Sequence, residues 1–193
     1  MFEESSTASS MGSRVAAVAA LGMGLFIALA VSGVRDARSA EHPDKYTLQV
    51  PDGLAFSDFR GYEGWQVVSL AQTDEVLKVI VANPAMIDAY KAGVPGNGKP
   101  FPDGSKIAKL QWTQKKSTDA PFSVNVPDNF KNVFFIEKDS ERFPKTSGWG
   151  YALFNYDAAS DSFTPDGSGA ACGYECHTRV ATKDYIFHPF QKR

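Results

Sequence analysis

Short runs of β-branched and aromatic residues, separated by Gly, Pro and Asp, recur along the chain after residue 45. Runs of this length and spacing are typical of strands joined by turns. An additional stretch, residues 46–50, alternates apolar and polar side chains and stops at the turn sequence Pro51-Asp52-Gly53. The predicted strands are residues 65–72, 76–81, 105–113, 131–138 and 149–156.

One segment shows the signals of a helix. Asn83 is a typical N-cap, Pro84 suits the first helical position, and residues 85–92 follow before a glycine ends the helix. Gly and Pro residues make residues 94–104 a loop, and the polar residues 157–168 predict a hairpin tip or loop. Short strands with one or two short helices predict a mainly β (α+β) fold built on an antiparallel sheet.

Residues 15–34 form an uncharged run rich in Ala, Leu, Gly and Val, with an arginine on either side. A run of this length can span a bilayer, which favours an uncleaved membrane anchor. Its Ala and Gly content and the small residues just before Ala40 favour a cleaved secretory signal. Both interpretations assign residues 1–39 to export from the cytoplasm and leave residues 40–193 as one domain.

The first ten residues do not suit a secretory signal. Glu3 and Glu4 make this start acidic, whereas secretory signals begin with basic residues. A start at Met11 gives Met-Gly-Ser-Arg ahead of the apolar run. We therefore expect translation to begin at Met11 rather than at Met1.

The charge balance and the cysteine count exclude two classes of protein. The chain has 20 Lys and Arg and 22 Asp and Glu, a formal net charge of −2, whereas nucleic-acid-binding proteins usually carry a basic excess. Its 2 cysteines, Cys172 and Cys176, lie too close together to hold a fold of this size. A disulfide-framework protein is therefore excluded as well.

The segment Cys172-Gly-Tyr-Glu-Cys176-His177 carries the clearest chemical signal. In c-type haem attachment, two cysteines separated by two residues form thioethers with the haem vinyl groups, and the next histidine binds the iron. The spacer here has three residues, and Gly173 would let a loop absorb the additional one. The segment predicts haem c (iron) bound by Cys172, Cys176 and His177, with His177 as the metal ligand.

Two other interpretations of the cysteine pair compete with haem. A disulfide between Cys172 and Cys176 would suit an oxidising compartment, although it would close only a short loop and add little stability. The chain would then be a haem-free binding or structural domain. A zinc site needs two or more further ligands, and only His42 and His188 remain, each isolated in the sequence.

Few residues are available to bind iron on the side opposite His177. Met86 is the one methionine after the leader, and its place on the predicted helix favours core packing. We expect His42 and His188 at the surface. An open sixth position favours binding or redox chemistry of a small ligand over electron transfer alone.

Several stretches match one known family in order: residues 65–69, 80–93, 100–112, 148–151, 171–178 and 183–187. In these stretches, which are spread in family order over most of residues 45–190, the chain resembles the cytochrome P-460 / cytochrome c′-beta family of periplasmic mono-haem proteins. The resemblance implies a β-rich fold, usually a homodimer, with haem bound near the C-terminus. It also implies a periplasmic location, with anchoring to the inner membrane left open, and a periplasmic electron carrier as partner.

The family has two branches with different chemistry. P-460 members carry a lysine covalently joined to the porphyrin and oxidise hydroxylamine, whereas c′-beta members lack the link, have an apolar distal pocket and bind nitric oxide. The resemblance implies Lys109 as the lysine of a haem cross-link, with Lys106 as second choice on the opposite face of the strand. A small nitrogen compound is the implied ligand or substrate, and hydroxylamine oxidation is left open as an activity.

Two charged residues are further candidates for the site. Hydroxylamine oxidation needs a proton acceptor, and Glu137 is placed for this by its strand, although a strand end is also an ordinary position for a solvated carboxylate. Arg179 follows the haem motif and could pair with a haem propionate, or lie on the surface like most arginines. Phe134 and Phe135 are expected in the core.

Overall fold

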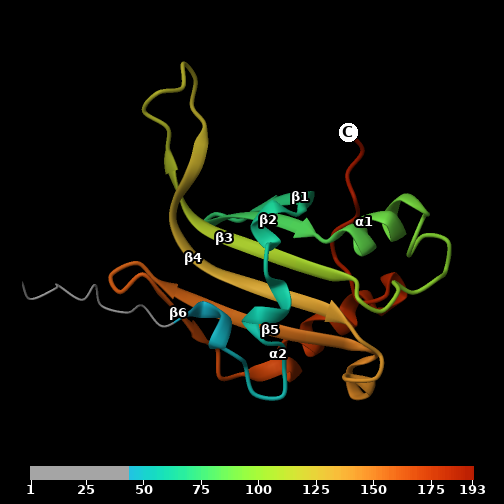
Figure 1. Ribbon diagram of the computed structural model, residues 1–193. Helices are drawn as coiled ribbons and strands as arrows, with labels where there is room; N and C mark the ends of the chain where they lie inside the picture. The colour runs from blue at the N-terminus through green and yellow to red at the C-terminus, as the bar shows by residue number, and fades with distance from the viewer. Residues whose placement is uncertain (1–43) are drawn as a thin grey trace, which may run out of the picture. The chain divides into compact units, whose positions relative to one another are not determined.

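Six strands form one antiparallel sheet in which each strand pairs with the next along the chain (Figure 1). The structure is a computed structural model that describes residues 44–193, so the predictions for residues 1–39, Met11 and His42 lie outside it. The expected mainly β (α+β), antiparallel fold with one or two short helices is confirmed. The strands are β1 (Gln66–Gln72), β2 (Val76–Ala82), β3 (Lys106–Lys116), β4 (Asn125–Lys138), β5 (Trp149–Asp157) and β6 (Ser162–Pro165).

Two α-helices and five 3₁₀ turns complete the described part of the chain. The α-helices are α1 (Pro84–Lys91) and α2 (Gly169–His177). In residues 44–193, no helix has the length and apolar character needed to cross a membrane. The 3₁₀ helices are η1 (Lys45–Thr47), η2 (Phe56–Phe59), η3 (Tyr62–Gly64), η4 (Pro144–Thr146) and η5 (Thr178–Lys183).

Helix α1 begins where the sequence predicts. The side chain of Asn83 accepts a hydrogen bond from the backbone N–H of Met86 at 3.1 Å, which satisfies a donor that the helix leaves unpaired. The same Asn83 oxygen accepts from the N–H of Lys106 at 3.0 Å. The cap therefore also fixes the start of β3 against the helix.

Four segments differ from the sequence-based expectation. Residues 46–50 do not join the sheet: they overlap the end of η1, and Gln49 forms an isolated bridge with Ala55. Strand β4 begins at Asn125 rather than residue 131, because the β3–β4 hairpin continues beyond the sheet (Figure 1). Residues 157–168 contain a short strand, β6, and helix α2 was not predicted at all.

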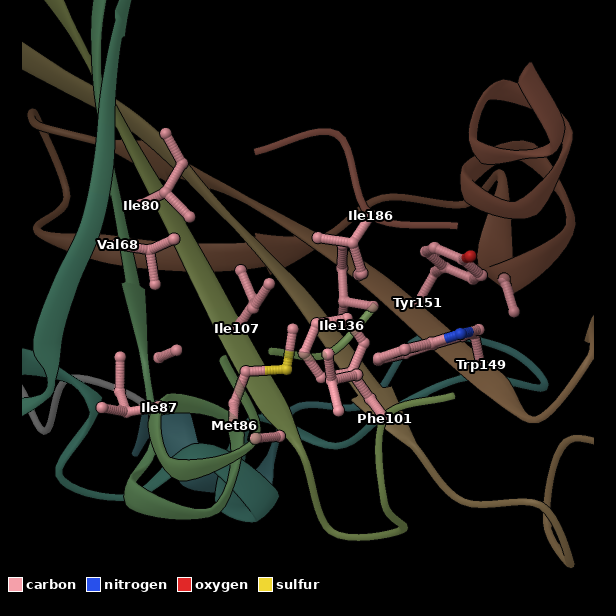
Figure 2. Close-up of a cluster of buried hydrophobic side chains, with 14 residues drawn as sticks. Val68, Ile80, Met86, Ile87, Phe101, Ile107, Ile136, Trp149, Tyr151 and Ile186 are labelled. Carbon is pink, nitrogen blue, oxygen red and sulfur yellow. The ribbon is translucent and has the colours of Figure 1, made fainter. Parts of the chain in front are cut away.

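The two faces of the sheet are both covered. Side chains alternate along a strand, so on β3 Ile107 lies on one face and Ala108 on the other, in separate buried clusters. The helical face packs against α1, α2 and the C-terminal segment, and Figure 2 shows its buried side chains. They include Val68, Ile80, Met86, Ile87, Phe101, Ile107, Ile136, Trp149, Tyr151 and Ile186.

The opposite, aromatic face is covered by the segment that contains η1, η2 and η3. Phe135 lies at its centre with no exposed surface. Its ring stacks on Phe59 at 4.1 Å between centroids and meets Phe56 edge-on at 5.1 Å. Half of the 14 phenylalanines of the chain belong to this cluster or pack against it.

The C-terminal tail runs along the outer edge of β1, close to α1 in Figure 1. The N–H of Gln191 donates to the carbonyl oxygen of Val68 at 3.1 Å, and Arg193 donates to the carbonyl oxygen of Val67. The hydroxyl of Tyr90 on α1 donates to the carbonyl oxygen of His188 at 2.8 Å. The tail therefore pairs with part of an otherwise open sheet edge.

Replacing Phe135 with Ala should lower the free energy of unfolding by about 3–5 kcal/mol, since it empties the centre of the aromatic face. Phe122 in the β3–β4 hairpin is 71% exposed, so Phe122→Ala should change stability by less than about 0.5 kcal/mol. Denaturant unfolding of both variants measures the difference. Equal losses would contradict the assigned packing.

Candidate functional site

Helix α2 presents both cysteines on one exposed face. Cys172 and Cys176 are free thiols, and both are exposed. A step of four residues is about 1.1 helical turns, so the two side chains lie one above the other. The expectation that Gly173 lets a loop absorb the additional spacer residue is therefore wrong, because the helix itself accommodates three residues between the thiols.

Gly173 has a different role, in packing α2 against the sheet. A Cβ atom at this position would lie 2.6 Å from the ring of Tyr151 on β5. Glycine therefore permits the close approach of the helix to the buried tyrosine, whose ring is fully inaccessible to solvent. This contact determines where the residues at the end of α2 lie.

The helical spacing disfavours a disulfide between the two cysteines. Side chains four residues apart on a helix have Cβ atoms about 5–6 Å apart, whereas a disulfide requires about 3.5–4.5 Å. A bond between Cys172 and Cys176 would therefore require α2 to unwind. The folded helix keeps both thiols available for reaction.

His177, the last residue of α2, points to the sheet and is only 9% exposed. Its ring lies 5.2 Å from the ring of Tyr151 and 4.8 Å from that of Phe187. It is nearly parallel to the ring of Phe134, at 14° and 6.2 Å. Aromatic side chains thus surround the imidazole.

The hydrogen bond of His177 fixes its tautomer. Its Nδ1 lies 2.5 Å from the carbonyl oxygen of Tyr185, and a carbonyl oxygen only accepts, so Nδ1 carries the proton. The lone pair on Nε2 is then available to a metal. Burial lowers the pKa of His177, and the nearby positive charge of Lys109 adds to this effect, so the neutral form that binds metals is favoured.

A small cavity of about 50 Å³ lies beside His177. Its wall is mostly apolar, and Lys109, Phe187 and His188 complete it. His188 was expected at the surface, but it lines this cavity and is partly buried. The cavity's apolar wall is made by Ile80, Ile107, Phe134, Ile136 and Ile186.

Lys109 shares this cavity with His177. In the sheet it pairs with Ile80 on β2 and Phe134 on β4, and its Nζ lies 4.7 Å from the centre of the Phe134 ring. It forms no ion pair with any of residues 44–193. Burial, together with the charge of Lys78, lowers the pKa of Lys109. Its cross-link to haem stays a prediction.

Lys106 and Glu137 lie on the aromatic face, away from this cavity. Lys106 Nζ lies 3.0 Å from the carboxylate of Glu137 and donates to the carbonyl oxygen of Asp58 at 2.7 Å. Glu137 is buried, and Arg142 approaches its second oxygen at 3.5 Å. Glu137 is therefore part of a structural ion pair rather than a solvated strand end, and it does not face His177.

The remaining residues that the sequence analysis considered for the site do not gather around His177. Met86 is fully buried in the core of the helical face. Arg179 is exposed on η5. Phe134 lines the cavity, whereas Phe135 is in the aromatic core. In the described part of the chain, no three His, Cys, Asp or Glu side chains gather as a metal-binding cluster.

The residues at the end of α2 fit a haem group. Two exposed thiols lie one turn apart, and the next residue is an imidazole whose Nδ1 is held by the Tyr185 carbonyl beside a mostly apolar cavity. An antiparallel sheet followed by a helix with this donor set is the class of fold and site that the structure defines. The family model described as Cytochrome P460 matches residues 59–188, and the chain belongs to this family. No curated protein sequence matches the chain significantly.

The substitution Gly173→Ala should destabilise the fold by about 1–3 kcal/mol, because the new methyl group overpacks against Tyr151. Gly167, whose added Cβ would meet nothing within 4 Å, supplies the control Gly167→Ala, with an expected change below about 0.5 kcal/mol. Thermal or denaturant unfolding checks both. An unaffected Gly173→Ala protein would show that α2 does not rest on Tyr151.

Proposed function

We propose that the protein is an exported mono-haem c-type cytochrome whose iron binds a small nitrogen compound. The observation that carries this proposal is His177, whose Nδ1–H is held by the Tyr185 carbonyl at 2.5 Å. It directly follows the two exposed thiols of Cys172 and Cys176. Family membership supports haem binding in general, and this geometry supports the c type.

Each residue of the segment has a distinct role in this proposal. The thiols of Cys172 and Cys176 would hold the haem by addition to its two vinyl groups, in which one S–H bond and one vinyl π bond are replaced by one C–S and one C–H bond at each site. Nε2 of His177 would bind the iron, and the Tyr185 carbonyl keeps the imidazole in the required tautomer. The bound haem supplies an iron centre that coordinates small ligands and exchanges electrons.

The cavity favours nitric oxide as the ligand. Its wall is formed mainly by isoleucine and aromatic side chains, and no carboxylate of residues 44–193 lines it. An uncharged diatomic molecule needs no proton acceptor and loses little solvation in such surroundings. Hydroxylamine oxidation is the second candidate. Lys109 supports this second candidate, because hydroxylamine-oxidising members of the family carry a lysine joined to the porphyrin. Burial lowers the pKa of Lys109, which favours the uncharged, nucleophilic amine that such a link requires.

Location and partners belong to the same proposal. The apolar run at residues 15–34 would direct the chain to the periplasm, where c-type haem is attached. A homodimer and a periplasmic electron carrier are the expected partners. Met86 is buried in the core and would not compete for the sixth iron position. His188 lines the cavity and is the described residue that could compete with the ligand there.

Covalent haem attachment is tested with the full chain exported from a host that attaches haem c. The expected product shows a Soret band, a pyridine haemochrome and an intact mass increased by one haem that reductant does not remove. Cys172→Ser with Cys176→Ser should abolish the covalent mass increase. A wild-type protein with no Soret band and two thiols released by reductant would instead support a haem-free domain with a disulfide.

The lysine cross-link is tested by Lys109→Met, with Lys106→Met as control, because Lys106 is on the opposite face of the sheet. The cross-link of the second candidate predicts a red-shifted Soret band in the wild type and in the control, and an ordinary high-spin c-type spectrum in Lys109→Met. The favoured nitric-oxide branch predicts the ordinary high-spin spectrum in all three proteins. Optical spectra of the reduced proteins measure this. A wild-type spectrum already of the ordinary high-spin type would assign the chain to the nitric-oxide-binding branch.

A further inference from the structure

The turn after η5 has an unusual backbone. Asp184 and Tyr185 both have left-handed φ angles, +48° and +64°. Two successive residues other than glycine in this region are disfavoured sterically, so other contacts have to hold the turn. The carbonyl oxygen of Tyr185, the second residue of this pair, accepts the hydrogen bond from Nδ1–H of His177.

The Asp184 carboxylate holds the turn through donors from three separate segments. One oxygen accepts from Lys138 Nζ at 3.0 Å and from the indole N–H of Trp149 at 3.3 Å. The other oxygen accepts from the backbone N–H of Phe101 at 2.7 Å. The Lys138 and Asp184 side chains are only 8% and 12% exposed, so solvent weakens this ion pair little.

Lys138 connects the same cluster to a second loop. Its Nζ also donates to the carbonyl oxygen of Ser147 at 3.0 Å. The hydroxyl of Ser147 in turn donates to the hydroxyl of Tyr185 at 2.8 Å. Tyr185 is thus fixed at both ends, its backbone by Asp184 and its side chain by Ser147.

We propose that Asp184, paired with Lys138, is a positioning residue for the iron ligand His177. The pair holds the Tyr185 carbonyl against Nδ1–H, which sets the plane of the imidazole and the direction of Nε2. A fixed acceptor at Nδ1 also makes Nε2 more basic and the bond to iron stronger. The proposal rests on the proposed function insofar as His177 binds haem iron.

The test compares Asp184→Asn and Lys138→Met with Lys106→Met in the haem-loaded full chain. Lys106 forms an ion pair with Glu137 on the opposite face of the sheet. Lys106→Met therefore serves as a control that breaks an ion pair of the sheet, with its cost in stability, but leaves the surroundings of His177 unchanged. In the first two variants, resonance Raman spectra should show the iron–histidine stretching band at lower frequency, and the reduction potential should become more positive. Lys106→Met should leave both unchanged. Asp184→Glu, which keeps the carboxylate, should restore part of the wild-type values.

A second readout does not require haem. In the chain produced without the attachment machinery, the Nδ1–H proton of His177 should be visible by NMR and exchange slowly with water. Asp184→Asn and Lys138→Met should both accelerate its exchange, and Lys106→Met should not. Unchanged exchange in both variants, or equal changes in Lys106→Met, would overturn the proposal. Failure of the wild type to take up haem would instead count against the proposed function alone.

Discussion

The alternation of side chains along β3 and β4 determines how both the core and the site are built. On β3, Ile107 and Lys109 face α2, whereas Lys106 and Ala108 face the N-terminal segment. A shift of one residue in the register would exchange the two sets. The phenylalanine cluster packs against the aromatic face of the sheet and contributes to the stability of the fold. The helical face can therefore contain the cavity beside His177 without supplying all of the packing that stabilises the sheet.

The end of α2 lies at a boundary between water and the interior. Cys176 is exposed and His177, the next residue, is buried. One residue of helix rotates the side chain by about 100°, which is enough to place the thiol in solvent and the imidazole against the sheet. A haem bound here would therefore be held by thiols at the surface and by an imidazole that packs against the sheet.

Much of the fold was predictable because its signals are local. Runs of β-branched residues mark the strands, and the dipeptide Asn83-Pro84 marks α1. Helix α2 carries no apolar periodicity, and its position depends on the contact between Gly173 and Tyr151, which are far apart in the sequence. Its helical character could not be predicted from residues 169–177 alone.

The site divides in the same way. Cys172, Cys176 and His177 are adjacent in a recognisable segment, and Lys109 came from the family resemblance. Asp184 and His188 carry no local signal in the sequence. Asp184 is bonded to Phe101 and Lys138, which are distant along the chain. His188 lines the cavity because of the path that the C-terminal tail takes. Glu137 was misjudged because the sequence does not show that Lys106 lies opposite it.

The C-terminal tail has a practical consequence for work on the protein. Gln191 and Arg193 bond to the outer edge of β1, and an uncovered strand edge invites pairing with another molecule. A purification tag fused after Arg193 would compete with these bonds and pull on Phe187 and His188 at the cavity. Aggregation and altered ligand access in such a fusion would then arise from the tag rather than from the native chain.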